Sequence, residues 1–136
     1  MSEVVSLERH DVVAIVTVNS PPVNALSAAV RGGIMDCVKR AIADPEAKVI
    51  VLTCAGRTFI AGADITEFGK PPKSPSLHDV LHEIENSPKP VVAAIHGTAL
   101  GGGLEVALSC HYRVAVKEAR LGLPEVKLGL DRTSVV

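Results

Sequence analysis

Aromatic residues are scarce in this sequence, which has no tryptophan, one tyrosine and two phenylalanines. Phe59, Phe68 and Tyr112 are too few and too scattered to form a platform on which nucleotide bases stack. An excess of one charge is lacking as well, because 14 basic residues stand against 15 acidic ones. No basic block is long enough to follow a phosphate backbone. These features argue against a nucleic-acid-binding protein.

Long hydrophobic runs are also missing, since no segment reaches the ~20 apolar residues that a membrane-spanning helix needs. The first residues include Glu3, Glu8 and Arg9, where a secretory signal would be apolar. The three cysteines are odd in number, widely spaced and set among apolar neighbours, unlike a disulfide framework or a zinc site. We therefore expect a protein of the cytoplasm, or alternatively of the mitochondrial or peroxisomal matrix, with no membrane partner.

The length of 136 residues and the 47% hydrophobic composition are enough for one domain with a core. Two β-branched stretches, residues 4–8 and 12–18, predict an antiparallel hairpin that turns at residues 9–11. Ser27 is placed to cap a helix with apolar residues at helical spacing, which Asp44 and Pro45 would end. The N-terminal part is thus expected to read strand, strand, helix.

The second half continues this alternation of strands and helices. Residues 49–53 form a short apolar run of the kind that is buried on both faces of a sheet. Ser76 and Asp79 resemble the capping box of a second helix, and Pro90 precedes an apolar strand beginning at Val91. A third helix would follow the glycines at 101–103, and another strand would follow that helix. The order indicates a layered α/β fold of repeated β-α units.

The glycine-rich stretch Gly101-Gly102-Gly103-Leu104-Glu105 joins an apolar strand to a helix. Glycines at such a junction allow positive φ and a close approach of the backbone to a bound group. The free amide groups at the helix start and the helix dipole can hold an anion or a developing oxyanion. A tight turn is the structural alternative for these glycines, and for Glu105 the alternative is a favourable interaction with the dipole.

A second loop, residues 61–65, is rich in small residues and also follows a buried strand. In a parallel sheet the two loops would emerge at the same edge, so their amides could bind one carbonyl oxygen together. Glu105 and Glu125 could then move protons or activate water beside that oxygen. Asp64 could instead cap a helix that starts at Ile65.

Other kinds of site lack their residues. His78 and His82 are four residues apart on a predicted helix but lack the flanking glutamate of a zincin, so a solvated helix face explains them better. The sequence contains no Gly-x-Ser-x-Gly elbow, no P-loop and no Gly-x-Gly-x-x-Gly fingerprint. We therefore expect neither a metal nor a nicotinamide cofactor.

Four stretches resemble the enoyl-CoA hydratase/isomerase (crotonase) family, and they occur in the family's order. They are Asn24-Ala25-Leu26, the run from Phe59 to Ile65, the run from His96 to Glu105, and the run from Gly122 to Gly129. The residues in these stretches most resemble the N-terminal hydratase part of bifunctional enoyl-CoA hydratase/3-hydroxyacyl-CoA dehydrogenases. The resemblance implies a crotonase-like spiral of ββα repeats over residues 1–130.

The resemblance also implies an enzyme of fatty acid β-oxidation that adds water across the 2,3 double bond of 2-enoyl-CoA. The backbone amides of Ala63 and Gly102 would form the oxyanion hole for the thioester, and Glu105 and Glu125 would be the catalytic pair. CoA is part of the substrate, so no separate cofactor is implied. The positions that match the CoA pocket of the family are Ala25, Ala61, Ala63 and Ile65.

Residues 131–136 do not match the family's pattern, which predicts a chain without the C-terminal helical region that closes the site. That region also helps to build the trimers that the family tends to form. Two other functions are therefore alternatives to hydration. One is an isomerase of the same family, and the other is an inactive fragment that only binds acyl-CoA or a partner chain.

Overall fold

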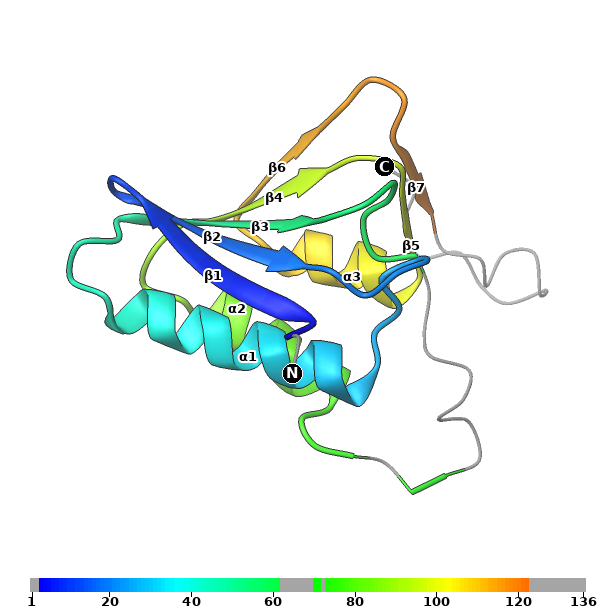
Figure 1. Ribbon diagram of the computed structural model, residues 1–136, viewed down its shortest axis with the longest axis horizontal. Helices are drawn as coiled ribbons and strands as arrows, with labels where there is room; N and C mark the ends of the chain where they lie inside the picture. Colours follow the sequence, from blue (N-terminus) through cyan, green and yellow to red (C-terminus); the bar gives the residue numbers. More distant parts are fainter. Residues whose placement is uncertain (1–2, 62–69, 72, 123–136) are drawn as a thin grey trace.

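The computed structural model describes residues 3–61, 70–71 and 73–122 of the chain. In this part a five-stranded sheet carries three helices on one face, and a small two-stranded sheet lies beside it (Figure 1). The large sheet has the order β1-β2-β3-β4-β6. Its strands are β1 (Val5–His10), β2 (Val13–Val18), β3 (Val49–Cys54), β4 (Val91–Ile95) and β6 (Tyr112–Ala115). The helices are α1 (Ala28–Ala43), α2 (Leu77–Glu85) and α3 (Gly102–Ser109).

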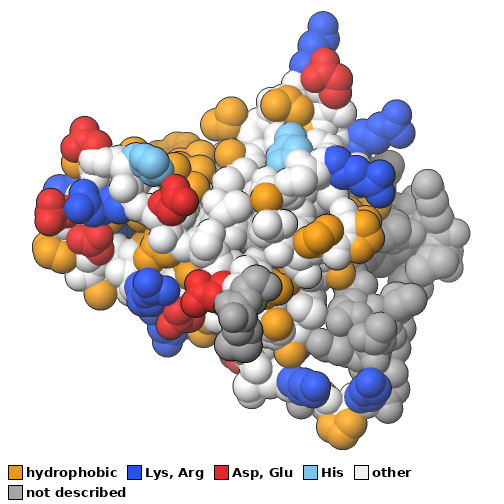
Figure 2. Space-filling view, in the orientation of Figure 1, with side chains coloured by type: hydrophobic (Ala, Val, Ile, Leu, Met, Phe, Trp, Pro, Cys, Tyr) orange, Lys and Arg blue, Asp and Glu red, His pale blue; other side chains and the backbone are white. Residues whose placement is uncertain are grey.

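The predicted hairpin is confirmed, with β1 and β2 antiparallel from the pair Val5 and Val18 to the pair His10 and Val13. The turn is shorter than residues 9–11, because β1 extends through His10 and Asp11 adopts a φ of 56°. Arg9 remains in the strand, and its guanidinium lies 3.2 Å from the Asp44 carboxylate at the end of α1. Figure 2 shows side chains of both charges together at this end of the molecule.

The strands β2, β3, β4 and β6 are parallel to one another, as the alternation of strands and helices predicts. Every second residue of β3 is buried, and the residues between are half-buried. The expectation that this strand is buried on both faces was therefore wrong for the described chain. The helices cover one face, and apolar residues such as Val49 and Val51 fall in the half-buried positions of β3.

Side-chain caps start two helices where the sequence predicts them. The Ser27 hydroxyl accepts a hydrogen bond from the Val30 amide at 3.1 Å, and α1 ends at Ala43. At α2 the Ser76 hydroxyl accepts from the Asp79 amide, while the Asp79 carboxylate accepts from the Ser76 amide, both at 3.0 Å. The hydrogen bond from the Ser76 backbone lowers the pKa of Asp79. The capping box is thus confirmed.

The strand β5 (Thr98–Leu100) departs from the expected path, in which the glycine turn follows the buried strand directly. It leaves the large sheet and pairs in parallel with β7 (Arg120–Gly122). Gly97 makes this change of direction with a φ of 68°. Any other residue would place its Cβ 2.6 Å from the Arg57 carbonyl oxygen, so only glycine lets the backbone come this close to the Arg57 loop.

The core lies between the large sheet and the three helices. Sheet residues and helix residues meet there with no exposed surface, and the largest include Val16, Ile50, Leu52, Ile34, Ile84 and Leu104. None of the helices in the described ranges has both the length and the apolar character needed to cross a membrane.

Two neighbouring glycines of α1 allow a test of this packing. A Cβ at Gly33 would lie 2.5 Å from Val5 Cγ2, whereas among the described residues a Cβ at Gly32 would approach only Pro75 Cδ, at 3.7 Å. We expect Gly32→Ala to raise the free energy of unfolding by about 0.5–1 kcal/mol through helix propensity. Gly33→Ala should lower it by about 1–3 kcal/mol through overpacking. Urea denaturation measures both, and equal midpoints would contradict this account of the α1–β1 contact.

Candidate active site

The two loops that the sequence places at one edge meet at Ala61 and Leu100. These residues form an isolated parallel bridge, and the Leu100 amide donates to the Ile60 carbonyl at 3.3 Å. The expected convergence is therefore confirmed for the first residue of the small-residue loop. The predicted site residues Ala63, Ile65 and Glu125, and also Asp64, lie outside the described residues.

The three consecutive glycines do not have the same structural role. Gly101 is the N-cap of α3 and has a φ of 53°. Gly102 and Gly103 belong to the first turn of α3, so only the first of the three glycines makes the turn. A Cβ on Gly103 would lie 2.0 Å from the Ile60 carbonyl oxygen, which excludes any side chain there. The helix start therefore packs directly on the backbone of the other loop.

Gly102 and Glu105 lie three residues apart in α3. The first amides of a helix have no acceptor within the helix, and the dipole makes this end partly positive. Glu105 is exposed and belongs to the same first turn of α3 as Gly102, so the two residues are about 4.5 Å apart along the helix axis. The Glu105 amide is itself used, because it donates to the Gly101 carbonyl at 3.0 Å. An oxyanion donor and a proton-transfer group can act together in this arrangement.

Asn24 fastens the neighbouring loop to this place. It is buried and has a φ of 53°. Its amide nitrogen donates to the carbonyls of Ala55 and Thr58 at 3.0 and 2.8 Å, and its amide oxygen accepts from the Ser20 amide at 2.7 Å. The half-buried Ala25 follows it directly. The sequence offered one signal for this role. Asparagine tolerates positive φ, and Asn24 lies between a proline pair and the cap of a helix.

A cavity of about 440 Å³ opens beside the converging loops. Ala61 is the predicted CoA-pocket residue that lines it, and Ala25 is not among the lining residues. The others, which sequence reasoning missed, are Val23, Arg57, Thr58, Gly97, Thr98 and Leu100. Arg57 is the only charged residue among the described residues that line the cavity. A basic residue in a loop after a buried strand was the signal for it.

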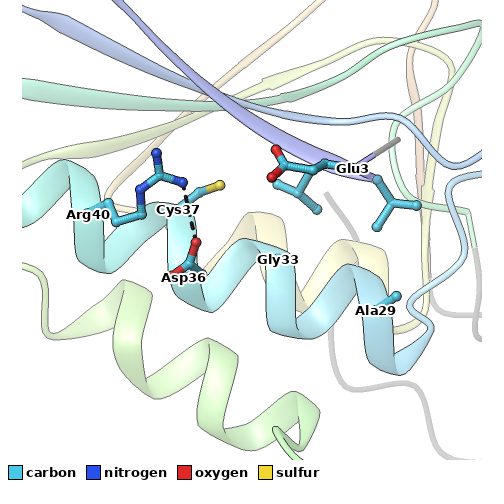
Figure 3. Close-up of a pocket in the computed structure, with 8 residues that line it drawn as sticks. Glu3, Ala29, Gly33, Asp36, Cys37 and Arg40 are labelled. Atoms are coloured by element: carbon cyan, nitrogen blue, oxygen red, sulfur yellow. Dashed lines mark hydrogen bonds and ion pairs between the residues drawn. The ribbon is translucent and has the colours of Figure 1, made fainter. Parts of the chain in front are cut away.

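A second cavity, of about 310 Å³, lies between the beginning of β1 and α1 (Figure 3). Its charged residues include Asp36 and Arg40, which pair with each other at 3.4 Å across one helical turn. Burial raises the pKa of the Cys37 thiol at its wall, with Arg40 opposing the shift. Because Asp36 and Arg40 pair with each other and the Cys37 thiol is protonated, we place the candidate site at the first cavity.

Cysteine and metal chemistry have no support in the described ranges. Burial raises the pKa of Cys54 and of Cys110 to about 12, so both thiols are protonated at neutral pH. His78 and His82 are exposed on α2. Within residues 3–61, 70–71 and 73–122, no group of histidine, cysteine, aspartate and glutamate side chains could hold a metal ion.

Known proteins with similar sequences share one family. The peroxisomal bifunctional enzyme of Danio rerio is 53% identical over 118 residues, which are 87% of this chain and 16% of that protein. The "Probable enoyl-CoA hydratase" of Bacillus subtilis is 43% identical over 133 residues, which are 93% of this chain and 52% of that protein. The chain thus spans about half of the second relative's length and much less of the first.

Solved structures agree with this relationship. An enoyl-CoA hydratase from Thermoplasma volcanium superposes with a TM-score of 0.84 at 30% identity, over 96% of this chain and 55% of that one. The mixed α/β architecture is therefore the crotonase fold, of which the chain spans about half. The model of the family "Enoyl-CoA hydratase/isomerase" matches residues 8–135. With nearly its whole length matched, the chain belongs to the enoyl-CoA hydratase/isomerase family.

Proposed function

We propose that the chain carries the catalytic loops of an enoyl-CoA hydratase, which adds water across the 2,3 double bond of a 2-enoyl-CoA thioester. The observation that carries this proposal is the first turn of α3. There the Gly102 amide lies at the positive end of the helix, and the exposed Glu105 belongs to the same first turn. Related enzymes are named for this reaction or for fatty acid β-oxidation, which gives the proposed setting.

The oxyanion hole would consist of the Gly102 amide and the Ala63 amide. Addition of water to an enoyl thioester places negative charge on the thioester oxygen, and fixed amide donors stabilise such a charge without reorganising. The contact of Gly103 with Ile60 supports this assignment, because it holds the start of α3 rigidly against the loop that leads to Ala63. Loss of one such donor typically lowers the rate on the order of 100-fold.

Glu105 and Glu125 would divide the proton transfers. In our proposal both carboxylates orient the attacking water, and Glu125 also handles the proton at C2. The described chain supports this pairing through Gly122, whose carbonyl accepts a hydrogen bond from the Gly101 amide at 3.1 Å. Gly122 precedes Glu125 by three residues in the sequence.

The CoA moiety would lie along the cavity beside the two loops. Ala25, Ala61, Ala63 and Ile65 are the small or apolar residues that we assign to its pocket. Arg57 adds a positive charge at this cavity, and CoA carries several phosphate oxygens that a guanidinium binds well. The proposed reaction needs no metal, since the amides would supply the oxyanion site and the carboxylates would supply the proton transfers.

The proposed surroundings follow from the same chain. Three free, buried thiols suit a reducing compartment, so we place the protein in the cytoplasm or in an organelle matrix. Tyr112, Val114 and Val116 are large hydrophobic residues that are exposed on or next to β6. Such an apolar strip supports assembly with further copies or with another chain.

The role of Glu105 is tested by replacing its carboxylate without changing its size. We expect Glu105→Gln to lower kcat for hydration of crotonyl-CoA by about 100-fold or more, because a general acid–base is lost. The absorbance of the conjugated thioester reports the rate. Glu46→Gln, at an exposed position in the turn before β3, is the control and should keep full activity. Equal rates for Glu105→Gln and the control would reject the hydratase.

The isomerase alternative is separated by its substrate. A 3-enoyl-CoA that is converted to the 2-enoyl isomer faster than crotonyl-CoA is hydrated would favour the isomerase over the hydratase.

The role of Arg57 is tested by binding. We expect Arg57→Gln to weaken the binding of CoA about tenfold, equivalent to about 1.4 kcal/mol, through loss of a charge-assisted hydrogen bond. Calorimetric titration measures the Kd. Crotonyl-pantetheine, which lacks the CoA phosphates, should bind both proteins equally. Arg9→Gln is the control, since Arg9 pairs with Asp44 and Glu46 away from the cavity. An unchanged Kd for CoA would exclude a phosphate contact.

A further inference from the structure

Arg31 joins two separate segments of the chain through backbone carbonyls. Its Nε donates to the Pro75 carbonyl at 2.7 Å, and its Nη1 donates to the Leu26 carbonyl at 2.8 Å. Its Nη2 donates to the Lys73 carbonyl at 3.1 Å. Lys73 and Pro75 are more than 40 residues away in the sequence. A planar guanidinium with five donors can bridge carbonyls in this way, which a single ammonium group cannot match.

Each of the two segments that Arg31 bridges leads to a leucine that lies next to Gly102. A Cβ placed on Gly102 would lie 2.8 Å from Leu26 Cδ1 and 3.2 Å from Leu77 Cδ2, so the two leucine side chains occupy the space beside this residue. Arg31 binds the carbonyl of Leu26 itself. It also binds the carbonyl of Pro75, two residues before Leu77, which is the first residue of α2. The guanidinium therefore fixes the backbone that supports each leucine.

We propose that Arg31 is a positioning residue, which sets the Gly102 amide for catalysis by holding Leu26 and Leu77 against it. This inference rests on the proposed function, because it takes the Gly102 amide as an oxyanion donor. Arg31 acts through the two leucines and does not touch the thioester. The cavity assigned to CoA is lined by other residues, which include Arg57 and Thr58, and Ala25 next to Leu26 is not among its lining residues. Loss of Arg31 should thus impair turnover and leave the binding of CoA intact.

The control for Arg31 lies on the same helix. Arg40 is also an arginine of α1, but it is exposed and its partner is Asp36, at 3.4 Å and one turn away. Arg31→Ala should lower kcat for crotonyl-CoA by about 10- to 100-fold, since a misplacement near 1 Å can cost about 100-fold. The Kd of CoA should not change. Guanidinium ion at a non-denaturing concentration should restore part of the lost kcat. Arg40→Ala should show neither the loss nor the rescue.

A readout independent of turnover follows the Gly102 amide itself. In a ¹H–¹⁵N spectrum, Arg31→Ala should shift the Gly102 resonance, whereas Arg40→Ala should not. If Arg31→Ala does not fold, Arg31→Lys replaces it in every assay. A lower kcat with the CoA affinity retained then supports the proposal, and a wild-type kcat overturns it.

The outcomes separate this inference from the function on which it rests. If Glu105→Gln loses activity while Arg31→Ala keeps the kcat of Arg40→Ala, the positioning role is overturned and the hydratase stands. If Arg31→Ala loses CoA binding and kcat together and guanidinium restores neither, Arg31 is a general stability element and the proposal is overturned. If the protein of natural sequence hydrates no enoyl-CoA, the proposed function fails, whatever the Gly102 resonance shows.

Discussion

The arrangement of the candidate site depends on the contact between Gly103 and the Ile60 carbonyl. A Cβ would approach that oxygen to 2.0 Å, so the first turn of α3 lies on the bare backbone of the neighbouring loop. Protein interiors are close-packed and hardly compressible, so the two backbone segments in this contact cannot shift much relative to each other. The contact sets where α3 begins relative to the loop at Ala61. The contact thereby helps to place Gly102 and Glu105, which belong to the same turn of α3.

Polar side chains hold the surrounding loops where hydrophobic packing alone would not define them. Asn24 binds the carbonyls of Ala55 and Thr58, and Thr58 in turn exchanges hydrogen bonds with the backbone of Thr98. Each such bond contributes only about 1 kcal/mol net, but a buried group left without its partner costs about 1–3 kcal/mol. The network therefore adds less to stability than to uniqueness, because alternative loop positions would leave several groups unsatisfied.

Local rules were sufficient for most of the scaffold. The hairpin, the caps at Ser27 and Ser76 and the parallel strands all follow from patterns within a few residues. The β5–β7 sheet does not, because it requires Gly97 to turn under the Arg57 carbonyl, a contact across 40 residues of sequence. The roles of Gly102 and Gly103 inside a helix, and the contacts of Arg31 with Lys73 and Pro75, are equally non-local. The sequence predicts candidate residues for the site, whereas the contacts that hold Gly102 and Gly103 could be found only in the fold.

Glu105 shows why a single residue was not enough to infer chemistry. A carboxylate in the first turn of a helix is favourable by about 0.3–1 kcal/mol through the dipole, so it needs no catalytic explanation. The same dipole and the same free amides stabilise an oxyanion placed at Gly102. The first turn of one short helix could thus attract a developing negative charge and also carry the carboxylate that we propose for proton transfer. The proposed function therefore rests on Gly102 and Glu105 occurring in one turn, together with the contact of Gly103 with Ile60, because Gly102 alone and Glu105 alone each have a structural explanation.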